Sequence, residues 1–175
     1  MKKFHNYLSN ISLFKFTIIA VIPQLILSLL ICCIGYTIVP IPSDFNGSAI
    51  TRNMNPFVLF ILQGFIGPFV ETLIFQFFII NMFLSFFKQD TKNVKVFSII
   101  GSGLIFGLVH FLNTKDSSLS WSIYYGFKNW IFGIILGYTY ILYYSKTNKD
   151  TKAILVTSLI HVLNNSLAII ITSIL

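Results

Sequence analysis

The stretch FVETLIFQF, residues 69–77, places a glutamate among large apolar side chains. Glu71 is the only glutamate of the chain. It lies in an apolar run, residues 56–87, of roughly 32 residues, whereas a helix needs only about 20 to cross a bilayer. This run therefore predicts a membrane-spanning helix with an ionisable side chain inside it, an uncommon arrangement that is usually functional.

The composition of the whole chain points to the same class of protein. Hydrophobic residues make up 55% of the chain and charged residues 10%, with a mean hydropathy of +0.82, whereas soluble domains carry roughly 25% charged residues. So few charges cannot cover a water-facing surface, and we predict an all-α integral membrane protein. The net charge of +7 comes largely from lysines at the ends of apolar runs. We therefore expect a lipid bilayer, and no nucleic acid, as a partner.

Five apolar segments predict a polytopic helical bundle. Nine lysines flank the segment ends on one side, against Arg52 and Lys115 on the other and Lys128 inside the fourth segment. This bias predicts a cytoplasmic N-terminus and an external C-terminus. The first segment follows lysines as a signal peptide does but is too long for one, so we expect an anchor helix. We predict an N-terminal anchor and polar external loop (1–55) and a four-helix core (56–175), with segments at 11–39, 56–87, 94–112, 121–144 and 153–175.

The second segment is long and contains Gly64, Gly67 and Pro68. Proline kinks a helix or begins a new one in its first turn. We expect a break near Gly67 and Pro68, which would put Glu71 in the first turn of the main helix.

Three ionisable side chains lie inside three different predicted spans: Glu71, His110 and His161. A charge at mid-membrane costs at least about 2.5–3.5 kcal/mol, so such residues usually face the bundle interior. Each one alone can be a polar contact between helices, but their combination favours a shared site. Asn165 lies one turn after His161 on the same helix face. Counting from the loops puts His110 near the outer surface and His161 nearer the cytoplasmic side, so helix tilt must bring them together.

These side chains suit the hydrolysis of a peptide bond. Glu71 can act as general base on a water molecule, His110 can share or shuttle the proton, and His161 with Asn165 can bind the oxygen of a scissile carbonyl. The competing interpretations are a non-enzymatic membrane module and a proton-coupled carrier subunit. The carrier is less favoured because the sequence shows no internal repeat.

The motifs resemble those of the CPBP intramembrane proteases, also called the ABI family, which include type II CAAX prenyl endopeptidases and bacteriocin-processing proteins. The family motifs E-E-x-x-x-R, F-x-x-x-H and H-x-x-x-N read here as ETLIFQ (71–76), FGLVH (106–110) and HVLNN (161–165), and the resemblance covers residues 57–172. It implies a four-helix protease core, with Glu71, His110, His161 and Asn165 as catalytic residues and Phe106 beside them.

The first motif departs from the family at two positions. Thr72 stands in place of the second glutamate and Gln76 in place of the arginine. Losing only one partner of a buried ion pair would cost about 3–5 kcal/mol, so the joint replacement indicates a matched change to neutral side chains that can bond to each other. We therefore expect intact catalytic residues in altered surroundings, and a smaller effect of Thr72→Ala than of Glu71→Gln.

The resemblance implies an intramembrane endopeptidase that acts on small peptides or protein tails, in CAAX-type processing, bacteriocin or pheromone processing, or self-immunity. The alternative is a non-catalytic immunity or binding module of the same fold. The family is often described as metalloproteases. We expect a metal-free, glutamate-activated water, and the alternative is a zinc site that uses His110 and His161. The residue usage suggests an AT-rich genome, so we expect the plasma membrane of a bacterium.

Overall fold

The computed structural model describes residues 7–8, 10–39, 55–87, 91–114 and 118–174. The elements in this part of the chain are all helical: α2 (Leu13–Ile38), a continuous run of helical segments from Pro56 to Phe87, α6 (Lys92–Thr114), α7 (Leu119–Thr147) and α8 (Asp150–Ile174). The predicted all-α bundle and its long helices are therefore confirmed, and the observed bounds lie close to the apolar segments of the sequence.

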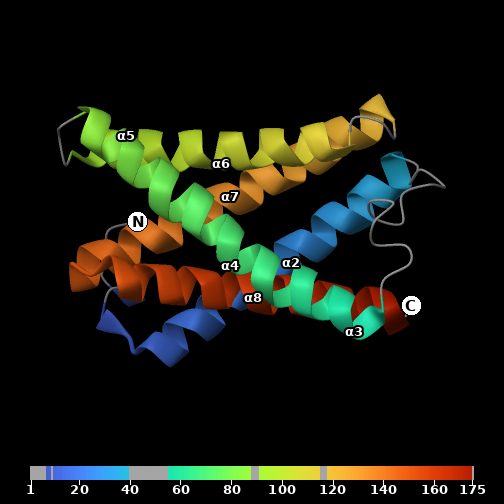
Figure 1. Ribbon diagram of the computed structural model, residues 1–175, viewed down its shortest axis with the longest axis horizontal. Coiled ribbons are helices and arrows are strands. Elements are labelled where there is room, and N and C mark those ends of the chain that lie inside the picture. Colours follow the sequence, from blue (N-terminus) through green and yellow to red (C-terminus); the bar gives the residue numbers. More distant parts are fainter. Residues whose placement is uncertain (1–6, 9, 40–54, 88–90, 115–117, 175) are drawn as a thin grey trace.

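The central run is built of five consecutive segments: α3 (Pro56–Leu59), the π-helix η1 (Phe60–Ile66), α4 (Gly67–Glu71), the π-helix η2 (Thr72–Ile79) and α5 (Ile80–Phe87). Figure 1 shows this run crossing the molecule diagonally, from α8 at one end to the α6–α7 pair at the other. Both π-helices and α4 contact α8, and η2 also contacts α6 and α7. The residues around Glu71 therefore lie where the central run meets the other core helices.

The expected break at Gly67 and Pro68 does not occur. Gly67 keeps helical backbone angles, and its N–H bonds to the carbonyl of Leu62, five residues back, as in a π-helix. A proline in a helix removes an N–H donor and crowds the carbonyl four residues earlier. Here the wider π turn before Pro68 accommodates the ring, and the carbonyl at that position, Gly64 O, accepts a hydrogen bond from Ser166 Oγ of α8 at 3.3 Å.

The helices α6 and α7 pack closely through glycines. A Cβ added to Gly107 would lie 2.6 Å from the Gly126 carbonyl oxygen, and one added to Gly133 would lie 2.9 Å from Gly103 Cα. Association between membrane helices depends on such close backbone approach, because lipid is as apolar as the side chains. Gly103, Gly107 and Gly133 all lie in this close contact, whereas Gly137 lies in a looser one.

Three helices are tied together at one end of the bundle by polar side chains. Asn81 of α5 donates a hydrogen bond to the Tyr140 hydroxyl of α7 at 2.8 Å, and that hydroxyl donates to Asp150 Oδ1 of α8 at 2.5 Å. The α5–α6 and α7–α8 junctions lie at this same end (Figure 1). The lysines near these junctions therefore gather at one end of the bundle, as the predicted topology requires.

The first helix packs on the bundle and does not stand apart from it. α2 contacts α7 and α8, and the rings of Phe16 and Tyr143 meet edge to face with centroids 4.7 Å apart. Lys146 Nζ also donates a hydrogen bond to the Ile11 carbonyl at 2.6 Å. The predicted anchor helix therefore shares its packing surface with the last two helices.

Three described stretches are long and apolar enough to cross a membrane: Phe57–Phe87, Lys92–Thr114 and Asp150–Ile170. Phe14–Leu27 of α2 is a further apolar stretch among the described residues. α7 has the length, but its serines, lysines and tyrosines and one asparagine lower its hydropathy. A helical membrane bundle is thus confirmed, and the number of five crossings stays a prediction.

The α6–α7 contact provides a stability test. Gly107→Ala should lower the free energy of unfolding by about 1–3 kcal/mol, because the new methyl group meets backbone that cannot move away. Gly137→Ala is the matched control, since the nearest atom to its Cβ would be the end of the flexible Ile80 side chain, at 3.3 Å, and Ile99 would lie at ordinary contact distance. Thermal unfolding in detergent, followed by tryptophan fluorescence, measures both variants. Equal melting temperatures for the two variants would contradict the proposed contact.

Candidate active site

Two of the predicted catalytic residues, Glu71 and His161, are in polar contact. Glu71 Oε2 lies 3.5 Å from His161 Nε2; the Glu71 side chain is 32% exposed and the His161 side chain 1%. Glu71 is the last residue of α4, and His161 lies in the middle of α8. An acid and an imidazole from two helices thus meet, with the histidine enclosed and the carboxyl group accessible on one side.

Thr72 fixes the orientation of the His161 ring. Its hydroxyl donates its single proton to the Pro68 carbonyl at 2.8 Å, and its oxygen lies 3.4 Å from His161 Nδ1. Having used its proton, this oxygen can only accept from the ring. We therefore assign a proton to Nδ1, and Nε2 faces Glu71. One further proton completes the contact, held either by the carboxyl group or by Nε2.

Phe106 brings His110 to the same site. The ring of this buried phenylalanine lies 4.4 Å from the His110 ring and 5.9 Å from the His161 ring, centroid to centroid. His110 Nδ1 lies 2.9 Å from the Phe106 carbonyl, so Nδ1 is the donor and Nε2 of the neutral ring is an acceptor. The two histidines, which counting along the sequence places at different depths, are therefore joined through one aromatic ring.

Asn165 lies one turn beyond His161 on α8 and is half-buried. Among the described residues, none of its hydrogen bonds reaches Glu71, His110 or His161. Its neighbour Asn164 is the more buried of the two, and its side-chain oxygen has no hydrogen-bond partner within the described part of the protein. The role expected for Asn165 thus depends on a bound substrate and stays a prediction.

The expected bond between Thr72 and Gln76 is absent. Thr72 bonds to Pro68 and His161, whereas both amide atoms of the fully buried Gln76 lack a partner in the described structure. The prediction assumed the four-residue spacing of an α-helix, but Thr72 begins the π-helix η2, whose wider turn separates the two side chains. Thr72 therefore contacts His161 directly and does not pair with Gln76 along the helix.

Zinc in proteins is held by several His, Cys or carboxylate side chains, and three are usual in catalytic sites. Within the described residues, no group of three His, Cys, Asp or Glu side chains lies close enough together to hold a metal ion. Glu71 and His161 are in contact, but no third side chain of this kind joins them in the described part of the chain. The residues in this arrangement do not fit a zinc site.

A comparison with protein families identifies the fold and the class of protein. The model of the type II CAAX prenyl endopeptidase Rce1-like family matches residues 53–167, more than half of the chain. The chain belongs to this Rce1-like family. Neither the curated proteins nor the solved structures gave a match. The Rce1-like family is a protease family, so its members act on peptides, and together with the apolar helices it identifies an integral membrane protein.

The match to the Rce1-like family contains all four predicted catalytic residues, because Glu71, His110, His161 and Asn165 lie between residues 53 and 167. Sequence reasoning did not anticipate the part played by Pro68 and Ser166. Pro68 supplies the carbonyl that fixes the Thr72 hydroxyl, and Ser166 bonds to the backbone just before it. The one available signal was the i+5 position of Ser166 relative to His161, which is too common in membrane helices to single it out.

The contact between Thr72 and His161 can be tested by nuclear magnetic resonance. Thr72→Val keeps the shape of the side chain but leaves the buried Nδ1–H without an acceptor, which costs about 1–3 kcal/mol and favours the other tautomer. The ¹⁵N chemical shifts of the His161 ring should therefore change in Thr72→Val and stay as in the wild type in Thr72→Ser. Unchanged shifts in the valine variant would refute the tautomer assignment.

Proposed function

We propose that this Rce1-like protein is an intramembrane endopeptidase that hydrolyses a peptide bond with a water molecule activated by Glu71. The observation that supports the proposal is the contact of Glu71 with His161, at 3.5 Å, with the carboxyl group partly exposed and the imidazole enclosed. A base must reach the proton that it removes. The Glu71 side chain is partly exposed, and we assign its exposed side to the substrate and water, while His161 provides it with a partner for the proton.

The reaction proceeds through a tetrahedral intermediate. The Glu71 carboxylate takes a proton from water, and the resulting hydroxide adds to the scissile carbonyl carbon, whose oxygen becomes negatively charged. When the carbon–nitrogen bond breaks, the proton passes to the leaving nitrogen, which gives one carboxylic acid and one amine. Because His161 Nε2 faces the carboxyl group, it can hold this proton between the two steps.

The remaining residues stabilise the negative charge that develops on the carbonyl oxygen, transfer protons or position His161. The Asn165 amide and the protonated Nε2 of His161 are the donors that we assign to this oxyanion. His110 has its Nδ1 bonded to the Phe106 carbonyl, so its Nε2 can accept a proton and act as a shuttle. Thr72 holds His161 with Nε2 towards Glu71 and is a positioning residue.

We propose small peptides or protein tails as substrates, in CAAX-type, bacteriocin or pheromone processing or in self-immunity, at the plasma membrane of a bacterium. Membership of a CAAX endopeptidase family supports the first of these substrate types. A second candidate function is a non-catalytic immunity or binding module of the same fold. The observation that favours it is the replacement of two charged family residues by Thr72 and the unpartnered Gln76.

Glu71→Gln keeps the size of the side chain but removes the base. It should lower cleavage of a quenched fluorescent tail peptide in proteoliposomes by about 10²–10⁴-fold, the usual effect of losing a general base. Asp150→Asn is the matched control, since this carboxylate lies at the Tyr140 contact and away from the site, and should keep its activity. Thr72→Val should lose less activity than Glu71→Gln, because it leaves the base in place.

The comparison uses equal amounts of protein in the membrane and both a farnesylated CAAX peptide and an unprenylated tail peptide. Full cleavage by Glu71→Gln would show the catalytic assignment to be wrong. If neither form cleaves a peptide but both protect cells from a toxic peptide, the binding module is the correct function.

The metal-free mechanism has its own test. Since no three ligands converge in the described part of the chain, cleavage should continue in the presence of 1,10-phenanthroline, and the purified active protein should contain far less than one zinc per chain by mass spectrometry. Loss of cleavage with the chelator and its recovery with added zinc would establish the alternative site, with His110 and His161 as ligands.

A further inference from the structure

Lys128 is an isolated cation inside a membrane helix. It lies well within α7, whose bounds are Leu119–Thr147, and its side chain is half-buried. The rise of about 1.5 Å per residue puts it about 13 Å from the start of this helix. The structure describes two carboxylates, Glu71 and Asp150, and neither forms an ion pair with it. Ionisable side chains at such depth usually face the bundle interior and bind a charged partner.

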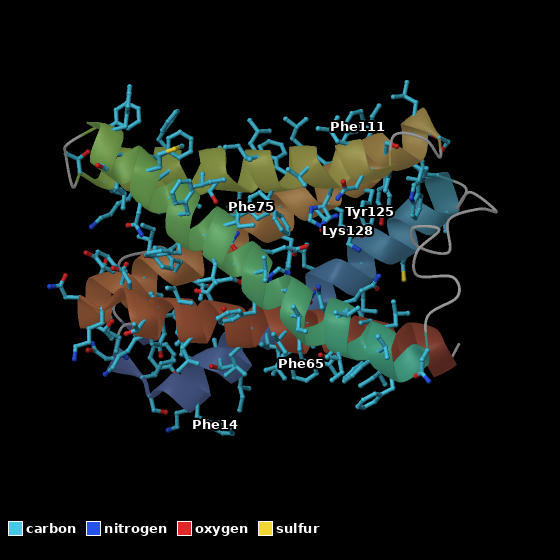
Figure 2. The ribbon with its side chains drawn as sticks, viewed as in Figure 1. Phe14, Phe65, Phe75, Phe111, Tyr125 and Lys128 are labelled. Atoms are coloured by element: carbon cyan, nitrogen blue, oxygen red, sulfur yellow. The ribbon has the colours of Figure 1, made fainter. Side chains whose placement is uncertain are left out.

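A continuous row of aromatic side chains connects Lys128 to the candidate active site. Lys128 Nζ lies 5.5 Å from the centre of the Tyr125 ring, and Tyr125 lies 5.8 Å from the His110 ring, centroid to centroid. Figure 2 shows Tyr125 and Lys128 together on α7. The row continues from His110 through Phe106 to His161. The ammonium group is also close enough to His110 to act on it electrostatically.

We propose that Lys128 binds a carboxylate of the substrate, and that the C-terminal carboxylate of a peptide tail is the group it receives. This inference rests on the proposed function. A tail that lies along the row with its scissile bond at Glu71 brings a negative charge to Lys128, which has no ion-pair partner among the described residues. A charge-assisted hydrogen bond between ammonium and carboxylate is among the strong polar contacts available to proteins.

The row also limits the length of the fragment that is released. Each ring contact spans 4.4–5.9 Å, and the contact of Lys128 with Tyr125 spans 5.5 Å. An extended chain covers about 3.3–3.6 Å per residue, so, with the 3.5 Å from His161 to Glu71 included, a fragment of about seven extended residues spans the row from the scissile bond to Lys128. Lys128 would thereby select short C-terminal fragments.

The test measures binding and not cleavage, so that it remains informative whether or not the protein is a protease. Each variant is made in the Glu71→Gln protein and placed in nanodiscs of neutral phosphatidylcholine. Fluorescence anisotropy then compares three farnesylated tail peptides: one with a free C-terminal acid, one with a C-terminal amide, and one amide with an aspartate as its last residue. The same three peptides without the farnesyl group form a second set.

The free acid should bind at least about tenfold more tightly than the amide, as expected for a hydrogen bond to a charged group. Lys128→Met, of similar length but without charge, should remove this preference, and Lys128→Arg should keep it. Lys92→Met is the control for a general loss of positive charge, because Lys92 is exposed at the start of α6, and it should keep the preference.

If the aspartate peptide and the free acid both bind more tightly than the plain amide, and to the same extent, the site accepts any carboxylate. If only the free acid binds more tightly than the amide, the site is specific for the C-terminal carboxylate. The proposal is overturned if acid and amide bind equally in both peptide sets, or if Lys128→Met retains the preference. Cleavage by the protein with Glu71 intact is measured separately. If the free acid is preferred but no peptide is cleaved, the proposed protease function is wrong and the carboxylate site stands. If peptides are cleaved but the free acid is not preferred, the carboxylate site is wrong and the protease function stands.

Discussion

The close approach of the central helical run to α8 is the constraint on which the site depends. Gly64 has no side chain to hold α8 away: a Cβ there would lie 3.1 Å from Ser166 Oγ. The hydroxyl instead bonds to the Gly64 carbonyl, the group that a proline four residues later deprives of its helical donor. One bond thus satisfies a backbone group and sets the distance between the helices. About two turns further along the central run, the same approach brings Glu71 and Thr72 to His161.

The sequence was sufficient for the helices but not for their local turns. Long apolar runs bounded by lysines predicted α6 and α8 well, because their length and composition are set by the bilayer. The break at Gly67 and the bond from Thr72 to Gln76 were wrong for one shared reason. Both predictions assumed α-helical geometry, and the central run contains π-helical turns on either side of α4. These turns arise from tertiary contacts around Pro68, which a local pattern does not contain.

For the candidate site too, the sequence predicted some features and not others. The types of its residues could be predicted, since ionisable side chains in apolar helices are costly and few. The path that joins His110 to His161 could not, because it passes through the ring of Phe106 and depends on how α6 and α8 are tilted. The contact of Thr72 with His161 could not be predicted either, because it joins residues 89 positions apart.

The replacement of a glutamate by Thr72 changes what surrounds Glu71 and His161. A hydroxyl that has donated its proton to a carbonyl offers His161 an acceptor without a charge. A carboxylate at the same place would add a second negative group beside Glu71, and the family's arginine would then be needed to balance it. With neutral side chains at both positions, the enclosed part of the site keeps a single acid and its histidine partners.

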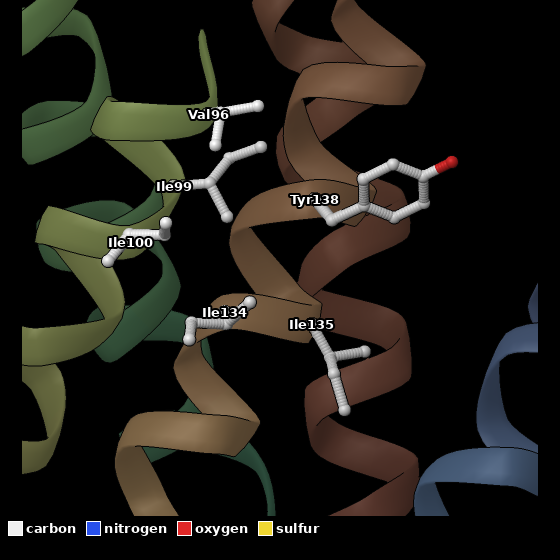
Figure 3. Close-up of a pocket in the computed structure, with 6 residues that line it drawn as sticks. All are labelled: Val96, Ile99, Ile100, Ile134, Ile135 and Tyr138. Carbon is white, nitrogen blue, oxygen red and sulfur yellow. The ribbon is translucent and has the colours of Figure 1, made fainter. Parts of the chain in front are cut away.

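The Tyr140 contact restricts the relative movement of three helices. Asn81, Tyr140 and Asp150 join α5, α7 and α8 at one end of the bundle, and α7 and α8 diverge from that end (Figure 1). The apolar hollow of about 390 Å³ lined by Val96, Ile99, Ile100, Ile134, Ile135 and Tyr138 lies between α6 and α7 (Figure 3), and is separate from Glu71. The two hydrogen bonds of Tyr140 therefore limit how far α5, α7 and α8 can separate at this end of the bundle.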